Sequence, residues 1–305
     1  MKDNNGISVI IPLYNRGVYV AEAIQSVIDQ QLDRPCEIIV SDDGSTDDGI
    51  IIAKSFGHPV KVLKKPDSCR DQGVSGTRNR GIQIASQRYI SFLDSDDLYL
   101  PGHLNCAISL LEANAEAGFV FSRTMEMREV DGQRILRPWT RAKVTTRDID
   151  YPVLSRPHIV HTNSFVFKAD VFKVVGLFNQ SYKNGEDGDM WMRISEQYKG
   201  LFSDHYGAIY RIEHGSGQLT ANNKSDVLAS TFKVYQAAMD RYRECGVYDQ
   251  YREFSLRQKL IGIDLISAHY ESKLEHQLRY YYELCKLIPV YPKAFILKLY
   301  DFLLN

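Results

Sequence analysis

The chain has 305 residues, of which 44% are hydrophobic and 25% are charged, and its formal net charge is −1. A chain of this length and composition can bury a substantial core, so an intrinsically disordered protein is excluded. The near-zero net charge argues against a protein that coats nucleic acid. The chain begins with a strand-like segment and lacks a charged region followed by an apolar one, so we expect no secretory signal.

The cysteines are widely spaced and never form a C-x-x-C pair; they are Cys36, Cys69, Cys106, Cys245 and Cys285. This pattern predicts neither a disulfide framework nor a zinc site. We therefore expect reduced thiols and a cytoplasmic protein. The most apolar stretch near the C-terminus, residues 284–304, is interrupted by lysines and prolines, so we do not expect it to span a membrane.

The N-terminal half alternates between strand-like and helix-like segments. Short apolar runs predict strands at Ile7–Ile11 (ended by Pro12), Glu37–Val40, Val60–Leu63, Tyr89–Leu93 and Phe119–Phe121. Helical spacing predicts helices at Val20–Ile28, Ile50–Phe56, after Gly73–Gly76 and after Pro101. Ser45 and Asp48 predict a capping box ahead of the second of these helices.

Such alternation predicts an α/β fold with a mainly parallel sheet flanked by helices. Ligands of these sheets bind beyond the carboxyl ends of the strands. Polar clusters follow three of the predicted strands, at Tyr14-Asn15, Asp42-Asp43 and Asp94–Asp97. We therefore expect these clusters to gather at one edge of the sheet.

The second half is less regular. Residues 122–157 indicate strands or loops over the sheet, and a strand over Asn163–Lys168 and a short helix ended by Gly176 follow. Acidic residues at 186–189 precede another predicted helix. From about Ser225 the pattern is helical, and we predict a C-terminal helical appendage. The predicted domains are residues 1–222 and 223–305.

Asp94-Ser95-Asp96-Asp97 is the most informative cluster. Carboxylates at alternating positions just past a strand suit Mg²⁺ or Mn²⁺, which take one or two carboxylates together with phosphate oxygens. Such an ion would neutralise a diphosphate leaving group. An acidic loop of this kind is also compatible with a solvated turn.

Other candidates have two interpretations each. Asp42 could accept a hydrogen bond from a nucleobase or form a turn with Gly44. The Tyr14 ring could stack on a base or pack in the core, and Arg78 could bind phosphate or form a surface salt bridge. Asp187 could be a general base or stabilise a helix start. His214 could be a ligand of a metal or phosphate, or be structural.

Five segments together resemble the family-2 inverting glycosyltransferases with the GT-A fold. They are Val9–Asn15, Ser41–Asp47, Thr77–Gly81, Phe92–Asp97 and Gly185–Arg193, and they occur in the order and spacing of that family. The resemblance covers roughly residues 7–215 and implies an enzyme of the bacterial type that assembles cell-surface glycans. Gly188 departs from the pattern, because family members often have an aromatic residue there.

The resemblance also implies the site residues. The nucleotide sugar would contact Pro12, Tyr14, Asn15, Asp42, Arg78, Asp94 and Ser95. Mn²⁺ or Mg²⁺ would be held by Asp96 and Asp94, with His214 reaching the metal or the diphosphate. Asp187 would be the catalytic base. The stretch Tyr210–Thr220 fits the family only loosely.

We therefore expect a metal-dependent hexosyl- or N-acetylhexosaminyl-transferase that uses a UDP-sugar and inverts its anomeric centre. The acceptor would be a glycan or a lipid-linked or protein-linked molecule. A non-catalytic nucleotide-sugar-binding or scaffold protein is the alternative; a nucleotidyltransferase is disfavoured because no glycine-rich loop follows the first strand. Apolar and lysine residues over 280–303 resemble an interfacial amphipathic segment, which could make peripheral contact with the inner face of the membrane. Packing on the catalytic domain or on a second subunit in a homodimer is the other interpretation.

Overall fold

A computed structural model of the chain describes residues 4–66, 68, 73–140, 148–149, 160–182, 184–212, 224–244 and 286. The chain divides into two compact units. The first is formed by Met1–Gln180 and Arg193–Gly215, and the second by Ser181–Met192 and Ser216–Asn305. The predicted border between residues 222 and 223 falls outside the described residues, so it stays a prediction.

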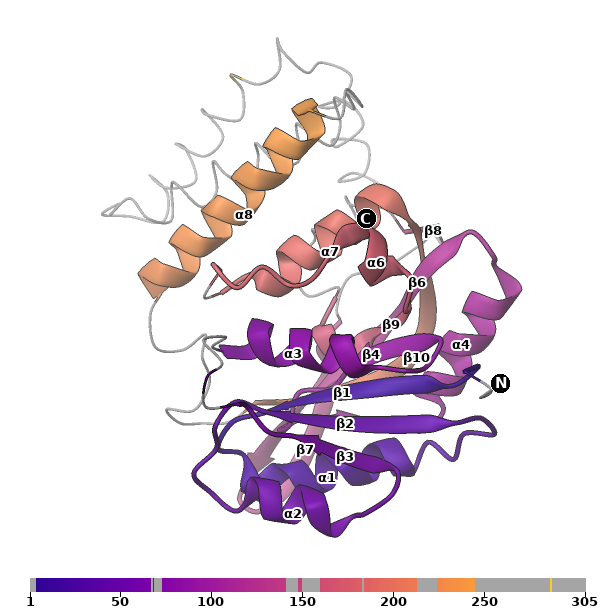
Figure 1. The fold of residues 1–305 in the computed structure, drawn as a ribbon, viewed down its shortest axis with the longest axis vertical. Coiled ribbons are helices and arrows are strands. Elements are labelled where there is room, and N and C mark those ends of the chain that lie inside the picture. Colours follow the sequence, from indigo (N-terminus) through magenta and orange to yellow (C-terminus); the bar gives the residue numbers. More distant parts are fainter. Residues whose placement is uncertain are drawn as a thin grey trace. The chain divides into compact units, whose positions relative to one another are not determined.

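Strands and helices alternate in the first unit as the sequence predicts (Figure 1). The strands are β1 (Ile7–Leu13), β2 (Cys36–Asp42), β3 (Val60–Leu63), β4 (Tyr89–Phe92), β5 (Leu98–Tyr99), β6 (Ala117–Val130), β7 (Gln133–Pro138), β8 (Asp148–Ile149), β9 (Phe165–Lys168) and β10 (Lys199–Ile212). The helices are α1 (Gly17–Ile28), α2 (Gly49–Ser55), α3 (Gly73–Ile84), α4 (His103–Ala113), the 3₁₀ turn η1 (Thr162–Ser164) and α6 (Val171–Val175). Helix α7 (Glu186–Gln197) has residues in both units, and α8 (Lys224–Glu244) lies in the second.

The strands described in the first unit form one sheet with the order β3-β2-β1-β4-β9-β6-β10-β5, to which β7 and β8 add at β6 and β10. Strands β3, β2, β1 and β4 are parallel neighbours, and β6 and β10 are also parallel. Strand β9 is antiparallel to both β4 and β6, so β4 and β6 run in the same direction. The carboxyl ends of β1, β2, β4, β6 and β10 therefore share one edge of the sheet, as the predicted α/β fold requires.

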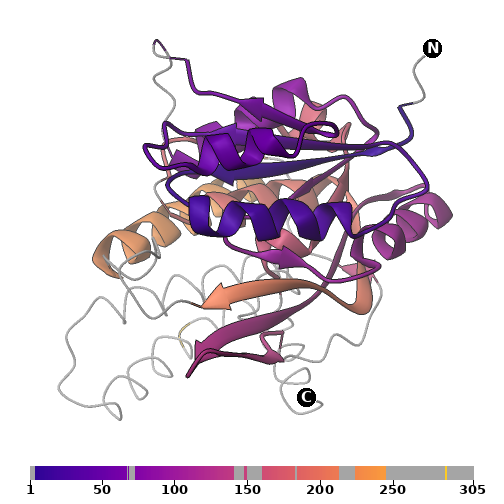
Figure 2. The same cartoon turned by 90° about the horizontal axis from the view of Figure 1, so that it is seen from below.

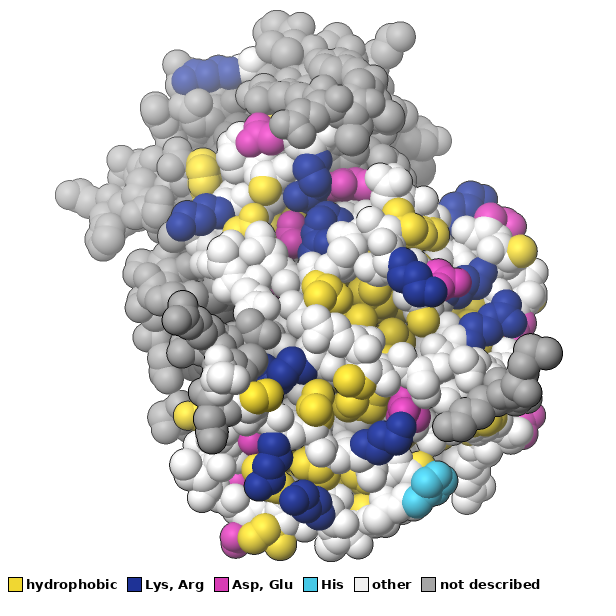
Figure 3. Space-filling view, viewed as in Figure 1, with side chains coloured by type: hydrophobic (Ala, Val, Ile, Leu, Met, Phe, Trp, Pro, Cys, Tyr) yellow, Lys and Arg dark blue, Asp and Glu magenta, His cyan; other side chains and the backbone are white. Residues whose placement is uncertain are grey.

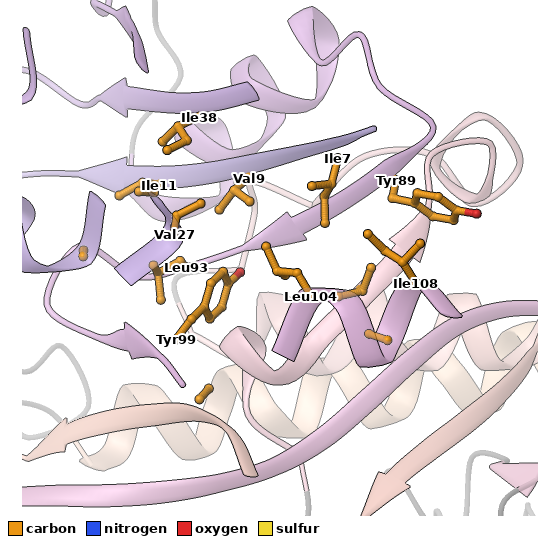
Figure 4. Packing of buried hydrophobic residues seen from close by; sticks show 14 of the residues in the cluster. Ile7, Val9, Ile11, Val27, Ile38, Tyr89, Leu93, Tyr99, Leu104 and Ile108 are labelled. Atoms are coloured by element: carbon orange, nitrogen blue, oxygen red, sulfur yellow. The ribbon is translucent and has the colours of Figure 1, made fainter. Parts of the chain in front are cut away.

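Helices cover both faces of the sheet. Helices α1 and α2 lie on one face and α3 on the other (Figures 1 and 2). Ile7, Val9 and Ile11 of β1 point to the face of α1 and pack with Val27 and Leu104 in a fully buried cluster (Figure 4). Their alternate neighbours point to α3, because successive side chains of a strand face opposite ways.

Two details of the sequence interpretation are wrong. Strand β1 continues through Pro12 to Leu13, where it still pairs with β2. On its other side, β4 pairs with β1 only as far as Ile10. One side of β1 thus has no ladder at Pro12, and the missing amide hydrogen is tolerated there. The predicted capping box is absent: the N-cap of α2 is Asp48, without a side-chain hydrogen bond, and Ser45 lies in the loop before it.

Strands β6 and β10 are much longer than the sequence suggests. Within β6, only Phe119–Phe121 was predicted as a definite strand, and the residues from Ser122 were left as strands or loops. Strand β10 was not expected at all. Register shifts interrupt the pairing of β10 with β6 between Ser203 and Tyr206 and again before Ala208. These irregularities remove the strict alternation of apolar and polar residues by which a strand is recognised from sequence.

Gly200 of β10 gives a test of this packing. A Cβ atom at Gly200 would lie 2.1 Å from Cζ of Phe119, whose side chain is fully buried. We expect Gly200→Ala to lower the free energy of unfolding by about 1–3 kcal/mol or more, because an overpacked core must shift its backbone. Urea denaturation followed by circular dichroism measures the change.

Gly188→Ala is the matched control. A Cβ atom at Gly188 meets nothing within 4 Å, and the residue lies in helix α7. The free energy of unfolding should therefore stay unchanged or rise by about 0.5–1 kcal/mol, since alanine favours a helix over glycine. Equal losses for the two variants would contradict the packing described for Gly200.

The second unit contains α8 and the first turns of α7. Buried Val234 of α8 lies 3.6 Å from the position of a Cβ at Gly185, immediately before α7. Further along α8, Nη1 of Arg241 lies 3.4 Å from Oδ1 of Asp189, a side chain that is 3% exposed. Helix α8 therefore packs on the start of α7 and neutralises one of its acidic residues.

None of the helices in the described ranges combines the length and the apolarity that a bilayer crossing requires. On the face shown in Figure 3, apolar side chains form small groups separated by Lys, Arg and acidic side chains. The segment 284–304, for which membrane contact was one interpretation, lies outside the described residues apart from Lys286.

Candidate functional site

Three polar loops meet at the edge of the sheet where β1, β2 and β4 end. Leu13 at the end of β1 lies opposite Asp42 at the end of β2. The amide of Asp43 donates to the Leu13 carbonyl at 2.9 Å, and on the other side of β1 the amide of Leu93 donates to the Ile10 carbonyl at 3.0 Å. The loops that follow the three strands therefore lie side by side, as expected from the strand pattern.

Asn15 joins the loops that follow β1 and β2. Its backbone has φ 50°, a left-handed conformation that asparagine tolerates. Its amide donates to Oγ of Ser45 at 3.1 Å, and its Oδ1 accepts from the amide of Thr46 at 2.8 Å. Beside it, Pro12 is buried and Tyr14 is 58% exposed. An exposed aromatic ring at this edge can stack on a flat ligand.

Asp42 is buried and forms a turn. Its Oδ2 accepts from the amide of Gly44 at 2.9 Å and its Oδ1 from the amide of Ser45 at 3.1 Å. Gly44 has φ 93°, which favours glycine. The turn, which was one of the two interpretations of Asp42 from the sequence, is thus present. Carboxylate oxygens have further lone pairs, so contact of Asp42 with a base remains compatible with the turn and stays a prediction.

Arg78 faces the loop that follows β4. Its Nη2 lies 2.8 Å from Oδ1 of Asp94, and its guanidinium carbon lies 5.5 Å from the centroid of the Phe178 ring. Helix α3 begins at Gly73, so Arg78 belongs to its second turn rather than to its amino end. The Arg78 side chain is almost fully buried, whereas Asp94 is 28% exposed. A buried, fixed cation at this edge suits an anionic ligand.

Asp96 pairs with Arg16, whose Nε lies 3.1 Å from Oδ2 of Asp96. Burial, followed by repulsion from Asp94, raises the pKa of Asp96, and Arg16 opposes this increase. The side chain of Asp96 is 27% exposed, and Ser95 before it is buried. The two carboxylates thus repel each other in a partly desolvated place, which a cation bound between them would relieve.

Asp97 is fully buried and holds the same loop in place. Its Oδ1 accepts from the amide of Arg211 at 2.7 Å, and its Oδ2 accepts from Nδ2 of Asn163. Burial, followed by repulsion from Asp96 and Asp94, raises the pKa of Asp97 well above its ordinary value. Both of its partners donate hydrogen bonds, and this geometry suits the ionised carboxylate.

Asn163 and Arg211 hold the acidic loop, residues Asp94–Asp97, in place by hydrogen bonds. Neither was predicted as a site residue. Oδ1 of Asn163 accepts from the amide of Asp94 at 2.9 Å, and Nε of Arg211 donates to the carbonyl of Asp96 at 2.8 Å. Arg211 lies next to the stretch in which His214 was expected to act, but nothing in the sequence around Asn163 indicates its role. Arg16, which directly follows Asn15, could have been found from its place in the loop.

The partly exposed carboxylates of Asp94 and Asp96 fit one kind of metal site. Among the residues that the structure describes, no group of three or more His, Cys, Asp or Glu side chains is arranged to hold a metal ion. Mg²⁺ in nucleotide enzymes needs only one or two carboxylates, because phosphate oxygens and water complete its shell. Asp94 and Asp96 therefore fit a hard divalent cation that arrives together with a diphosphate.

We expect Asn163→Ala to loosen the acidic loop and destabilise the protein. The Asn163 side chain is fully buried, and its removal leaves Oδ2 of Asp97 and the amide of Asp94 without this partner. The free energy of unfolding should fall by about 2–4 kcal/mol, the cost of two unsatisfied buried groups. Asn114→Ala is the control for urea denaturation: Asn114 bonds the Leu110 carbonyl near the surface, and its loss should be below about 1 kcal/mol. Equal losses would contradict the role of Asn163.

Asp187 lies in the first turn of α7, within the second unit. It is half-buried, and its Oδ1 accepts from the amide of Gly188 at 2.7 Å. Burial, followed by the charge of Asp187, raises the pKa of Tyr235 on α8 to about 12. The acidic helix start that the sequence predicts is therefore present, and the catalytic role of Asp187 stays a prediction. His214 lies outside the described residues.

A protein-family model described as Glycosyl transferase family 2 matches residues 8–176. An uncharacterized glycosyltransferase of Rickettsia felis is 27% identical over 233 residues, which is 74% of this chain and 38% of that protein. Another of Haemophilus influenzae is 23% identical over 92% of this chain and 90% of its own length. The minor teichoic acid biosynthesis protein GgaB of Bacillus subtilis is 30% identical over 64% of this chain and 22% of that protein. The chain thus spans well under half the length of several curated relatives it matches.

Solved structures share the fold. Residues 1–349 of TarS from S. aureus, in complex with UDP-GlcNAc, match with a TM-score of 0.66 and 17% identity over 90% of this chain and 78% of that one. The same fragment in complex with UDP matches with a TM-score of 0.65 and 17% identity, over 89% of this chain and 77% of that one.

Proposed function

Because the chain belongs to glycosyl transferase family 2 and has the GT-A fold, we propose that it transfers a sugar from a nucleotide-diphosphate sugar to a hydroxyl group of an acceptor. The observation that carries this proposal is the edge of the sheet. There Asp94 pairs with the buried Arg78, and Asp96 pairs with the more exposed Arg16. Carboxylates for a metal ion and guanidinium groups for phosphate are the chemistry that a sugar diphosphate needs.

The nucleotide would lie over the ends of β1 and β2. The Tyr14 ring would stack on the base beside Pro12, and Asp42 would accept a hydrogen bond from a base N–H group. Asp94 would contact the ribose, while Arg78 would contact the nucleotide. A uracil base, and hence a UDP-sugar carrying a hexose or an N-acetylhexosamine, is supported by the UDP and UDP-GlcNAc complexes of the similar TarS structure.

We propose that Mn²⁺ or Mg²⁺ is bound by Asp96 and Asp94, with His214 as a further contact. When bound, the ion would neutralise charge on the departing diphosphate. In the structure, Arg16 forms an ion pair with Asp96, so this pair would have to break when the ion and the diphosphate bind. Arg78 is almost completely buried and would stay paired with Asp94.

Transfer would occur in one displacement. Asp187 would take the proton of the acceptor hydroxyl, and the oxygen would form a bond to the anomeric carbon as the bond from that carbon to the diphosphate oxygen breaks. The nucleoside diphosphate leaves with the electron pair, and the anomeric centre is inverted. The state between has the character of an oxocarbenium ion, as in glycoside hydrolysis. The role of Asp187 rests on the family resemblance of the segment Gly185–Arg193.

The acceptor would be a glycan or a lipid-linked or protein-linked molecule. The relative named as a minor teichoic acid biosynthesis protein supports a polymer acceptor. We further propose that the enzyme acts in the cytoplasm, with residues 284–304 reaching the membrane or a second copy of the chain. Liposome flotation of the full chain and of a chain ending before Leu284 tests the membrane contact, and equal behaviour of the two would contradict that contact.

A thermal-shift panel tests the nucleotide and the metal together. The full chain is heated with UDP, other nucleoside diphosphates and UDP-sugars, each with Mn²⁺ and with EDTA. We expect UDP and one UDP-sugar to raise the melting temperature with Mn²⁺ only, because a ligand of the folded state stabilises it. A chain stabilised by no nucleotide would contradict the proposal. Binding without transfer to any acceptor would favour the non-catalytic alternative.

A further inference from the structure

A row of three aromatic rings lies next to the acidic loop and takes no part in the contacts proposed above. The Trp139 ring meets the His161 ring edge-on, with centroids 5.4 Å apart, and the His161 ring lies 4.6 Å from the Tyr210 ring. The three side chains come from the residue after β7, from the residue before η1 and from β10. Each is half-buried, so each keeps some exposed surface.

The row is joined to the acidic loop through two of its members, His161 and Tyr210. Nδ1 of His161 accepts from the amide of Asn163 at 3.5 Å, and Asn163 in turn accepts from the amide of Asp94. Burial, followed by the carboxylates of Asp94–Asp97, raises the pKa of Tyr210 to about 12. The next residue of β10, Arg211, donates its amide to Oδ1 of Asp97 at 2.7 Å, so Tyr210 is adjacent in the chain to a residue that bonds this loop.

The row lies on the face of the sheet opposite α1. Tyr210 and Arg211 are consecutive residues of β10 and point to opposite faces. The guanidinium carbon of Arg211 lies 4.6 Å from the centroid of the Tyr19 ring of α1, so Tyr210 faces away from that helix. At the outer end of the row, the amide of Trp139 donates to the carbonyl of Thr124 at 3.0 Å, which fixes the backbone that carries the indole.

We propose that Trp139, His161 and Tyr210 form a stacking surface for a pyranose ring bound beside the diphosphate. Aromatic rings offer a flat apolar face to the C–H groups of a sugar, while the imidazole and the phenol hydroxyl can bond its hydroxyl groups. The position of the row beside Asp94–Asp97 rests on the proposed function, since the diphosphate is assigned to that loop. The sugar bound there belongs either to the nucleotide sugar or to the acceptor.

The test compares sugar binding with nucleotide binding in the full chain. Titration calorimetry measures the affinities for UDP and UDP-GlcNAc with Mn²⁺, and saturation-transfer NMR measures those for methyl hexopyranosides in the presence of UDP. The variants are Trp139→Leu, which removes the ring, and Trp139→Phe, which keeps one. Phe232→Leu, at an exposed aromatic of α8, is the control.

We expect Trp139→Leu to weaken the sugar-dependent binding by about tenfold, as for the loss of one aromatic stacking contact. Trp139→Phe and the control should keep that binding, and the UDP affinity should be equal in all variants. A lower affinity for UDP-GlcNAc identifies the sugar of the nucleotide, and a lower affinity for the methyl glycosides identifies the acceptor. Wild-type protein that binds no sugar probe, or Trp139→Leu that binds every one unchanged, overturns the stacking surface. Failure of UDP to bind while the glycosides still depend on Trp139 would instead contradict the proposed function.

Discussion

Replacing Asp187 with asparagine is expected to lower sugar transfer by about 10²–10⁴-fold while nucleotide-sugar binding stays unchanged. Asparagine has the same shape, and its Oδ1 can still accept from the amide of Gly188 as Asp187 does at 2.7 Å. It cannot take a proton from the acceptor hydroxyl. Initial rates of UDP release at saturating acceptor measure the transfer, and calorimetry with a UDP-sugar measures the binding.

Asp189→Asn is the control in the same turn of α7. Asp189 is almost fully buried and pairs with Arg241, so this substitution should lower stability rather than remove a base. Near wild-type transfer by Asp187→Asn would end the assignment. The same would follow if Asp189→Asn lost as much transfer with its melting temperature unchanged.

Asp96→Asn is expected to remove the effect of the metal ion on nucleotide binding. The affinity for UDP with Mn²⁺ should fall to the value measured with EDTA, and transfer should fall with it, because an amide oxygen is a much weaker ligand for a hard cation than a carboxylate. The fold should tolerate the change. The pKa of Asp96 is raised above its ordinary value, so ionising it costs more in the folded than in the unfolded chain, and a neutral replacement avoids that cost at neutral pH.

Asp204→Asn controls for the loss of one negative charge. Asp204 is 76% exposed and pairs with Arg123 on β6. Its substitution should leave both the Mn²⁺ effect and the transfer rate as in the wild type, because a surface ion pair contributes little. If Asp96→Asn kept the full gain in UDP affinity on addition of Mn²⁺, the proposed metal site would be wrong.

The predictable part of this molecule is the part whose signals are local. Strand β2 and helix α1 are each predicted by the spacing of their own apolar residues. The parallel sheet follows from their alternation, and the sheet then brings the polar clusters after β1, β2 and β4 to one edge. The family resemblance supports the same arrangement, and the match to residues 8–176 confirms the family.

The supports of the site could not be predicted, because they depend on tertiary contacts. Asn163 and Arg211 reach the acidic loop from positions 66 or more residues away along the chain. The bulges of β10 that bring Arg211 there also conceal the strand in the sequence. For the capping box, the local pattern predicted a contact that is absent. Ser45 has the local pattern of a cap, but its hydroxyl oxygen accepts from the amide of Asn15 in the neighbouring loop instead.

Proton NMR of the anomeric signal tests the central claim most directly. The full chain is incubated with Mn²⁺, a UDP-hexose or UDP-N-acetylhexosamine, and a mixture of aromatic glycosides as acceptors. We predict that the α-anomeric signal of one UDP-sugar disappears, that UDP is released, and that the new glycoside shows the β configuration. A product that keeps the α configuration would contradict inversion, and UDP-sugars that all stay intact would contradict transfer itself.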